Sequence, residues 1–143
     1  MFPAFDFQVH WRDLDANGHV GNSSYLDFAT QARMFYLESQ GFPPSDFKRN
    51  GIGPAVLVDH LEYRRELRHH DRFQVTVSLG GMNAARDRFI FAHRFLNGAG
   101  DICVTLRSML VYFDLTARKK AKPTPVLQAA MEALPRDDAW EDL

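Results

Sequence analysis

The sequence predicts an α+β fold in which one long helix lies across an antiparallel sheet. Residues 23–40 carry apolar side chains at spacings of three and four, which is the period of a helix with one buried face. After Pro54 the chain instead shows runs in which apolar and polar residues alternate, separated by segments that contain Gly and Asn. An apolar helix stripe and an apolar sheet face must be buried against each other, so we expect the helix to cross a curved sheet.

The first strand is expected near the start of the chain. Phe5, Phe7, Val9 and Trp11 alternate there with polar residues, and a period of two is typical of a strand with one buried face. The polar segment DLDANGHVGN, residues 13–22, follows and predicts a loop. The predicted helix therefore begins beside this loop.

The helix predicted over 23–40 has favourable residues at both ends. Residues 22–24 (Asn-Ser-Ser) are good N-cap types, Gly41 suits the position after the last turn, and residues 43–44 (Pro-Pro) prevent continuation. The apolar stripe consists of Tyr25, Phe28, Ala29, Ala32, Phe35 and Tyr36. This stripe is the face that we expect the sheet to cover.

Four further strands are predicted, over residues 55–67, 72–81, 87–97 and 101–115. The glycines that separate the last three fit hairpin turns, so these strands should be antiparallel neighbours. Residues 45–53 are expected to form a loop, and residues 124–134 a short terminal helix. Together with the first strand, the prediction is a five-stranded sheet.

The composition excludes several classes of protein. At 143 residues, the chain is expected to form one domain over 1–143 with one hydrophobic core. A formal net charge of −1 gives no general attraction to nucleic acid or to an anionic membrane. No apolar run approaches the roughly 20 residues of a membrane helix, and the first residues lack the features of a signal peptide. The single cysteine, Cys103, excludes an internal disulfide, and we expect a cytoplasmic protein.

The polar loop has part of the pattern of a calcium-binding EF-hand. Asp13, Asp15, Asn17 and Gly18 occupy the first, third, fifth and sixth positions. The twelfth position is Ser24, which cannot supply the bidentate carboxylate that such a loop requires. The preceding segment also has the period of a strand and not of a helix. We therefore expect no calcium site and look for another role for these residues.

The same loop carries a family motif. The pattern D-x-D-x-x-G-H-V-x-N-x-x-Y, from Asp13 to Tyr25, followed by a helix and four strands, resembles the hotdog-fold acyl-CoA thioesterases of the 4-hydroxybenzoyl-CoA thioesterase-like group. The resemblance extends from about Phe5 to Leu115, and outside the motif it consists of the order and length of the elements. Family members often carry GHVNN where this chain has GHVGN, so Gly21 replaces an asparagine. The resemblance implies a hotdog fold, with one long central helix wrapped by a five-stranded antiparallel sheet, and hydrolysis of an acyl-CoA thioester.

Thioester hydrolysis needs a nucleophile or an activated water at the carbonyl carbon, and donors for the oxygen that becomes negative. The resemblance points to Asp15, either as the nucleophile or as the general base. The backbone N–H of Asn22 or its neighbour is the expected oxyanion site, and Gly18 lets the loop bend close to the substrate. His19 either orients Asp15, donates to the thioester oxygen, or only satisfies a buried hydrogen bond. Tyr25 lies on the apolar helix stripe, so it is expected to belong to the core or to the pocket wall and not to act as an acid.

A purely structural role is the alternative for this loop. An Asp and an Asn before a helix are most often caps and turn formers, and it is the resemblance that favours catalysis. Asp13 is expected to be structural and to bond backbone amides of its own turn. If Asp15 is dispensable, Asp27 in the first turn of the helix is the next candidate, since some family branches carry the catalytic carboxylate there. Cys103 has no base beside it in the sequence and is expected to be a buried thiol.

Coenzyme A carries phosphate groups, so its binding site needs cations at the mouth. The dense basic run after the last predicted strand, Arg118, Lys119 and Lys120, is the substrate-binding candidate. A looser group at residues 64–68 contains three arginines, and ordinary solvated surface is the alternative for both groups. The pair at residues 69–70 (His-His) is expected to form a turn, because adjacent strand residues point to opposite faces. We expect no metal and no cofactor.

A non-catalytic acyl-CoA-binding hotdog module is the alternative function, because a fold does not dictate an activity. The carboxylate at Asp15 discriminates the two, since a pure binder does not need it. A hotdog dehydratase that acts on acyl carrier protein fits less well, because those enzymes pair a carboxylate on the central helix with a loop histidine. An acyl carrier protein as the thioester donor remains open. Hotdog thioesterases join sheets edge to edge and hold the acyl group between subunits, so the resemblance implies a homodimer or a homotetramer.

Overall fold

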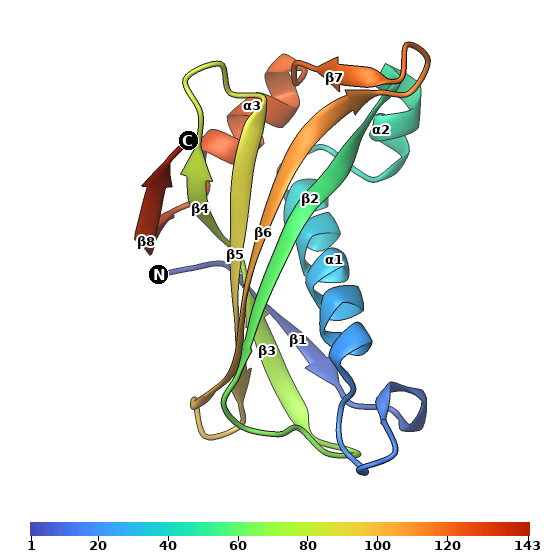
Figure 1. The fold of residues 1–143 in the computed structure, drawn as a ribbon, viewed down its shortest axis with the longest axis vertical. Helices are drawn as coiled ribbons and strands as arrows, with labels where there is room; N and C mark the ends of the chain where they lie inside the picture. Colours follow the sequence, from blue (N-terminus) through green and yellow to red (C-terminus); the bar gives the residue numbers. More distant parts are fainter.

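The computed structural model describes residues 1–143, and in it a long helix packs on one face of a curved sheet (Figure 1). The helix is α1 (Asn22–Ser39), which begins and ends one residue earlier than predicted. The strands are β1 (Ala4–Gln8), β2 (Ile52–Tyr63), β3 (Arg72–Thr76), β4 (Ser78–Met82), β5 (Arg88–Asn97), β6 (Ile102–Asp114), β7 (Lys119–Ala121) and β8 (Arg136–Asp142). Two short helices are α2 (Ser45–Asn50) and α3 (Pro125–Glu132). None of the helices combines the length and the apolar character that a membrane span requires.

β5 lies at the centre of the sheet. One of its edges pairs with β3 and β4, and the other pairs with β6, all antiparallel. β1 extends the sheet beyond β3, β8 extends it beyond β4, and β2 extends it beyond β6. The predicted arrangement of one long helix across an antiparallel sheet, with hairpin neighbours on both sides of β5, is confirmed.

The sheet contains eight strands where five were predicted. The strand predicted over 72–81 is divided at Val77 into β3 and β4, which pair with different halves of β5. The additional β8 runs parallel to β4, and its acidic sequence RDDAWED shows no apolar alternation. Ion pairs hold β8 in place instead, since Asp137 lies 3.5 Å from Arg94 and 3.2 Å from Arg107. A strand anchored in this way has no periodic signal in the sequence.

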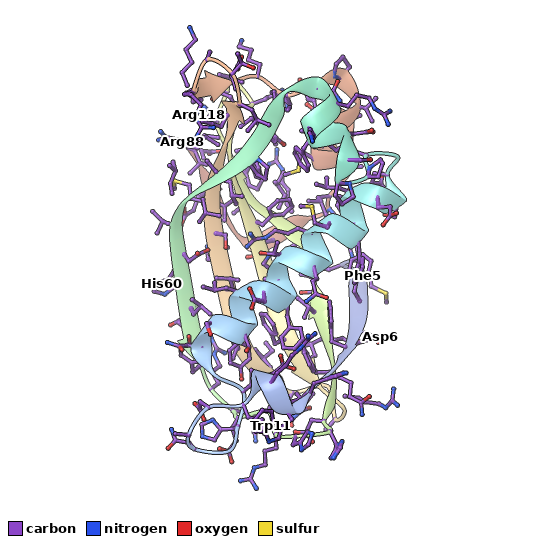
Figure 2. The ribbon with its side chains drawn as sticks, turned by 90° about the vertical axis from the view of Figure 1, so that its right-hand side faces the viewer. Phe5, Asp6, Trp11, His60, Arg88 and Arg118 are labelled. Atoms are coloured by element: carbon purple, nitrogen blue, oxygen red, sulfur yellow. The ribbon has the colours of Figure 1, made fainter.

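The buried face of α1 lies over the sheet as its apolar stripe predicts. Tyr25, Ala29 and Tyr36 belong to a core of 28 buried residues between helix and sheet. Phe35, predicted on the same stripe, lies at its margin and is 43% exposed. Its ring centroid is 5.8 Å from that of Phe5, labelled on β1 in Figure 2. The stripe is therefore wider than the face that the sheet covers.

Two local predictions were wrong. The segment at residues 45–53, expected to be a loop, contains α2, which is too short to show a hydrophobic period and ends at Gly51 with a φ of 67°. Trp11, predicted on the buried face of the first strand, lies in a 3-10 turn and is 77% exposed, because β1 already ends at Gln8. The predicted terminal helix is confirmed as α3, and residues 69–70 form the expected turn.

β2 forms a long free edge of the sheet. It pairs with β6 along one side, and no strand pairs with its other side. Near its middle, Val56, Leu57 and Val58 are 48%, 50% and 54% exposed, and a bulge interrupts the register. In Figure 2, β2 runs along one margin of the molecule, where His60 is labelled. A strand edge with exposed apolar residues is a surface that another chain commonly covers.

Candidate active site

The loop between the 3-10 turn and α1 is held by its own backbone. The N–H of Asp15 donates to the carbonyl oxygen of His19 at 2.9 Å, and the N–H of Gly18 donates to that of Asp15 at 3.1 Å. Gly18 has a φ of 79°, which glycine adopts without strain. Asp15 Oδ1 accepts the backbone N–H of Asn17 at 2.8 Å, and Oδ2 has no backbone partner. The loop therefore presents one carboxylate oxygen that is free to act.

Asp13 is bound to the backbone on both sides of the loop. Its Oδ2 accepts the N–H of His10 at 2.8 Å, and its carbonyl oxygen accepts the N–H of Gly21 at 3.0 Å. The expected bonding of Asp13 to a backbone amide is therefore confirmed. No group of three or more His, Cys, Asp or Glu side chains is arranged to hold a metal ion.

His19 stands between two carboxylates. Its Nδ1 lies 3.9 Å from Asp15 Oδ2, which is too long for a hydrogen bond, and its Nε2 lies 3.3 Å from Glu66 Oε2. A side-chain hydrogen bond from Arg68 holds the pKa of Glu66 below its usual value. An anionic Glu66 favours a proton on the nitrogen that faces it, so Nδ1 is left as the acceptor that faces Asp15.

Two backbone contacts join this loop to the segment that follows β2. The N–H of Val20 donates to the carbonyl oxygen of Leu67 at 2.8 Å, and His19 forms an isolated antiparallel bridge with Arg68. Figure 1 shows both segments at the same end of the molecule, next to the first turn of α1. These contacts bring Glu66 next to Asp15 and His19, which lie much earlier in the chain.

The first turn of α1 offers an unpaired backbone donor beside the loop. Three neighbouring N–H groups have acceptors, those of Gly21, Ser23 and Ser24. The N–H of Asn22 has no partner in the structure. A free N–H at the positive end of a helix dipole is suited to an oxygen that gains negative charge.

A pocket of about 870 Å³ brings these groups together. It is lined by Asp15, His19, Val20, Asn22, Tyr25, Tyr63, Arg64, Arg65, Glu66 and Asn97. Four of the predicted site residues are on this list, and Gly18 shapes the loop without lining the pocket. The loop, the start of α1 and the segment after β2 thus contribute to a single pocket.

Tyr25 forms part of the apolar wall of this pocket, as expected. Its ring packs edge-on against Tyr63 and Phe95, at centroid distances of 5.7 and 5.2 Å. Burial raises the pKa of Tyr25 to about 12, so the phenol stays neutral at physiological pH. The side chain therefore supplies shape, and no charge, to the pocket.

The other candidates for a catalytic residue, Asp27 and Cys103, do not line this pocket. Asp27 lines a separate hollow on another side of α1, together with Asp13, and does not line the pocket of Asp15. Cys103 is fully buried, and this burial raises the pKa of its thiol. The expectation of a buried, unreactive thiol agrees with this placement.

The basic run at residues 118–120 lies at the opposite end of the molecule from this pocket. β6 crosses the sheet over 13 residues, and the run follows its far end. Figure 2 labels Arg118 near one end of the molecule and Trp11, close to the predicted catalytic loop, at the other. Arg64 and Arg65 line the pocket instead. Within one chain, the structure does not bring the predicted phosphate-binding run and the catalytic loop together.

The members of that run have other neighbours. Arg118 lies over the ring of Phe113, with 5.0 Å to the centroid, and Lys120 Nζ lies 3.3 Å from Asp87 Oδ1. Hydrogen bonds from Asn83 and then Lys120 hold the pKa of Asp87 below its usual value, opposing its desolvation. Half of the Lys120 side chain is nevertheless exposed, at 49%.

Outside the motif, sequence reasoning missed three residues that line the pocket: Tyr63, Glu66 and Asn97. Tyr63 ends β2 on the face that α1 covers, so a correct strand register would have indicated it. Glu66 and Asn97 have no local signal, because each is positioned by contacts between distant segments. The sequence indicates the arginines at residues 64–65 only as part of a loose basic group.

Known proteins resemble this chain in sequence. A family model described as the thioesterase-like superfamily matches residues 9–131. A putative esterase from Aquifex aeolicus is 31% identical over 97 residues, which are 68% of this chain and 73% of that protein. A chloroplastic acyl-acyl carrier protein thioesterase from Arabidopsis thaliana is 28% identical over 141 residues, which are 96% of this chain and 72% of that protein.

Solved structures resemble it in fold. The crystal structure of a 1,4-dihydroxy-2-naphthoyl-CoA thioesterase from Synechocystis superposes with a TM-score of 0.82 at 20% sequence identity. The match covers 93% of this chain and 96% of that one. The hotdog fold expected from the motif is therefore confirmed.

Proposed function

The chain belongs to the thioesterase-like superfamily and is a thioester hydrolase, and we propose that it acts on acyl-CoA with Asp15 as the residue that starts the reaction. Family membership supports the coarser activity, which is hydrolysis of a thioester of coenzyme A or of acyl carrier protein. One observation carries the finer proposal. The free Oδ2 of Asp15 and the unpaired N–H of Asn22 belong to residues that line the same pocket.

In the proposed reaction Asp15 acts as a general base. The 3.9 Å between Asp15 Oδ2 and His19 Nδ1 suits a water that donates one hydrogen to each. Asp15 takes a proton from this water, and the oxygen attacks the thioester carbonyl carbon. His19 is a positioning residue in this scheme, held by Glu66 through its other ring nitrogen.

The carbonyl oxygen becomes negative as the carbon becomes tetrahedral. The N–H of Asn22 donates to this oxygen, and the dipole of α1 adds to the stabilisation. When the carbon–sulfur bond breaks, the thiolate takes the proton that Asp15 holds. The products are the free acid and the thiol, and Asp15 returns to its ionised form.

Direct attack by Asp15 is the second route, and it starts from the same oxygen. It forms a mixed anhydride between Asp15 and the acyl group, which water then hydrolyses. A single turnover in water enriched in oxygen-18 detects direct attack when the water adds at the aspartyl carbonyl of the anhydride. Direct attack, followed by water adding at the aspartyl carbonyl, leaves the label in Asp15, whereas the general-base route puts it only in the released acid.

The phosphate groups of coenzyme A require cations near the pocket. Arg64 and Arg65 line it within the same chain, and we propose that they bind the pyrophosphate. The backbone N–H groups of both residues donate to the carbonyl oxygen of Cys103, at 2.8 and 3.0 Å. Their main chain is therefore fixed while the long side chains remain able to adjust.

We further propose a two-fold homodimer in which β2 pairs antiparallel with β2 of a second copy. The support is the free edge of β2, with its unpaired backbone groups and the exposed run Val56, Leu57 and Val58. A closed isologous interface of this kind is the commonest arrangement for a soluble homo-oligomer. Two such dimers would form the homotetramer that is the alternative.

Antiparallel pairing reverses one chain relative to the other. Ile52, at the start of β2, pairs with Asp114, whose carbonyl oxygen accepts the N–H of Arg118 at 2.9 Å. The basic run at 118–120 of one chain therefore approaches the pocket at the Tyr63 end of β2 in the other. In the proposed dimer this run contributes to phosphate binding across the interface, and Arg64 and Arg65 contribute within the chain.

Thiol release from a panel of short-chain, long-chain and aromatic acyl-CoAs tests the proposed reaction. Wild-type protein should hydrolyse at least one class, and Asp15→Asn should lower kcat by about 100-fold or more, which is typical of a lost general base. Asp27→Asn is the matched control, because Asp27 is a carboxylate in a separate hollow. A folded Asp15→Asn protein with nearly wild-type kcat would contradict the assignment. The same acyl groups on acyl carrier protein decide the preferred donor.

A further inference from the structure

A second cavity lies between α1 and the sheet, closed by α2 and α3. Its volume is about 170 Å³, and ten of its thirteen lining residues are hydrophobic. The aromatic rings of Phe47, Phe89 and Phe91 contribute to this lining. Three side chains, Thr30, Arg33 and Tyr112, bring polar groups to this surface. The Thr30 hydroxyl already donates to the carbonyl oxygen of Leu26 at 3.0 Å. None of the three takes part in the proposed reaction steps.

Tyr112 has a buried hydroxyl without a partner. Its side chain is 2% exposed, and its Oη makes no hydrogen bond in the structure. Burial raises the pKa of this phenol, so the hydroxyl keeps its proton and is available as a donor. Buried polar groups are nearly always hydrogen-bonded, because an unsatisfied one costs stability, so this exception calls for an explanation.

Arg33 is the second polar group, and it is 5% exposed. Its Nε donates to His93 Nε2 at 3.0 Å and its Nη2 donates to Ser108 Oγ at 2.5 Å. No protein acceptor bonds its Nη1. Burial lowers the pKa of Arg33 to about 10, so the guanidinium is still a cation at neutral pH.

The nearby acceptors are already used. Ser108 Oγ, which accepts from Arg33, donates its own hydrogen to Asp59 Oδ1 at 2.5 Å. His93 is buried with its Nδ1 2.9 Å from the carbonyl oxygen of Thr76. The cavity therefore offers two unused donors, one of them on a cation. The complementary ligand is apolar over most of its surface and carries an oxygen that accepts hydrogen bonds.

The size of the cavity limits that ligand. An engineered protein cavity of about 150 Å³ with an apolar lining binds benzene, so this space suits one six-membered ring or a chain of similar volume. We propose that this cavity recognises a compact acyl group with an acceptor oxygen remote from the thioester, and that Tyr112 and Arg33 donate to that oxygen as specificity residues. This inference rests on the proposed thioesterase reaction and specifies its substrate class.

The position of the cavity determines whether an acyl group bound in it reaches Asp15 of the same chain or Asp15 of the partner subunit. Asn22 and Arg33 are eleven residues apart on α1, which corresponds to about 16 Å at the rise of an α-helix. A compact acyl group bound near Arg33 does not reach Asp15 of its own chain. In the antiparallel dimer, the Pro54 end of β2, which lines the cavity, lies near Asp15 of the partner subunit. The acyl group of one active site therefore occupies the cavity of the other chain.

A binding experiment tests the donors without any hydrolysis. Phenol and toluene have nearly the same shape and differ in one acceptor oxygen. Wild-type protein should bind phenol at least about tenfold more tightly than toluene, since a hydrogen bond to a charged donor contributes a factor of this size. In Tyr112→Phe this ratio should fall several-fold. An unchanged ratio in Tyr112→Phe, or no preference in wild-type protein, would overturn the proposal.

The variant is informative because it should fold. Tyr112→Phe removes only an unsatisfied hydroxyl, so Tm without ligand should be equal to or above that of wild-type protein. Tyr36→Phe is the matched control, because Tyr36 Oη is also buried but donates to the carbonyl oxygen of Ala130 at 2.6 Å. This control should lower Tm and leave the phenol-to-toluene ratio unchanged. The opposite pattern of Tm values would contradict the assignment of Tyr112.

Hydrolysis then tests the substrate class with two matched pairs. These are benzoyl-CoA with 4-hydroxybenzoyl-CoA, and hexanoyl-CoA with 6-hydroxyhexanoyl-CoA. Wild-type protein should favour the oxygen-bearing member of at least one pair by about tenfold or more in kcat/KM, and Tyr112→Phe should lose most of this preference. Equal preferences in the two proteins would overturn the inference. Absence of all acyl-CoA hydrolysis would count against the proposed function instead. The phenol experiment would still decide whether the cavity prefers a ligand that carries an acceptor oxygen.

Discussion

The backbone N–H of Gly21 donates a hydrogen bond to the carbonyl oxygen of Asp13 at 3.0 Å. This bond joins the N-cap of α1 to the residue two positions before Asp15. The loop and the first helical turn therefore form one structural unit. Asp15 Oδ2 and the N–H of Asn22 are two groups that this unit leaves without backbone partners.

The oxyanion role of Asn22 can be tested by removing its backbone N–H. Proline is tolerated at the first position of a helix, and Gly21 before it has the extended conformation, φ −77° and ψ 156°, that a residue before proline prefers. Asn22→Pro should therefore keep Tm near the wild-type value and lower kcat by about 100-fold or more, as expected for a lost oxyanion donor. Asn22→Ala keeps the N–H and should retain most of kcat. Equal kcat values in the two variants would remove Asn22 from the mechanism.

Substitutions of the two aspartates of the loop should have different effects, one on stability and the other on activity. Asp13→Ala deletes the acceptor of the His10 N–H, and loss of a capping side chain costs about 1 kcal/mol of unfolding free energy. The carbonyl oxygen that holds Gly21 remains, so kcat should change little. Asp15→Asn should show the reverse, because an amide oxygen still accepts the N–H of Asn17. Urea unfolding and thiol release, measured on both variants, check this; a large loss of kcat in a folded Asp13→Ala protein would reverse the roles.

His93 predicts how stability depends on pH. Burial, followed by the charge of Arg33, lowers the pKa of His93 to about 3 in the folded protein, against a value near 6.5 in an unfolded chain. Between these values the unfolded state binds one more proton. The contribution of His93 is therefore fully present above the unfolded pKa and is lost as pH falls toward the folded one, by about 1.4 kcal/mol per pH unit.

His93→Gln isolates this effect. Glutamine retains an oxygen that can accept from Arg33 and does not titrate, so its unfolding free energy should fall less steeply between about pH 6 and pH 4. Urea unfolding at four pH values in this range gives both slopes. If wild-type and variant slopes coincide, His93 is not the group that titrates.

The proposed interface can be tested with a charge on the free strand edge. Wild-type protein should sediment at micromolar concentration with twice the 16.4 kDa chain mass or a multiple of it. Leu57→Lys places a charge on the exposed apolar run of β2 and should give single chains with little activity. Val126→Lys changes an apolar residue that is 51% exposed on α3, away from this edge, and should remain assembled. An active wild-type protein that sediments as one chain would contradict the interface.

Much of the fold followed from local patterns. The helix was predicted within one residue because its apolar stripe, Asn-Ser-Ser start and Gly41 are all properties of neighbouring residues. The three longest strands, β2, β5 and β6, were predicted for the same reason. β8 and α2 were not, because β8 is held by ion pairs to Arg94 and Arg107, and α2 is shorter than two turns.

The residues of the candidate site also differ in whether local sequence patterns predict them. The motif drew attention to Asp15, His19, Asn22 and Tyr25, which lie within eleven consecutive positions and line one pocket. The basic run at 118–120 was recognised as cationic, but its distance from that pocket within the chain depends on the path of β6 across the sheet. The position of a run of charged residues relative to a pocket can be determined only when the strands around it are placed.

The sequence by itself determined the order of the elements, the loop and its family motif, because each is expressed in the spacing of nearby residues. The tertiary structure alone decided that Glu66 faces His19, that Arg64 and Arg65 line the pocket, and that β2 has a free edge. It also decided that Arg33 and Tyr112 meet in one cavity although they lie on α1 and β6. Such contacts depend on strand register and on the packing of the helix against the sheet, which arise only when segments distant in the chain come together.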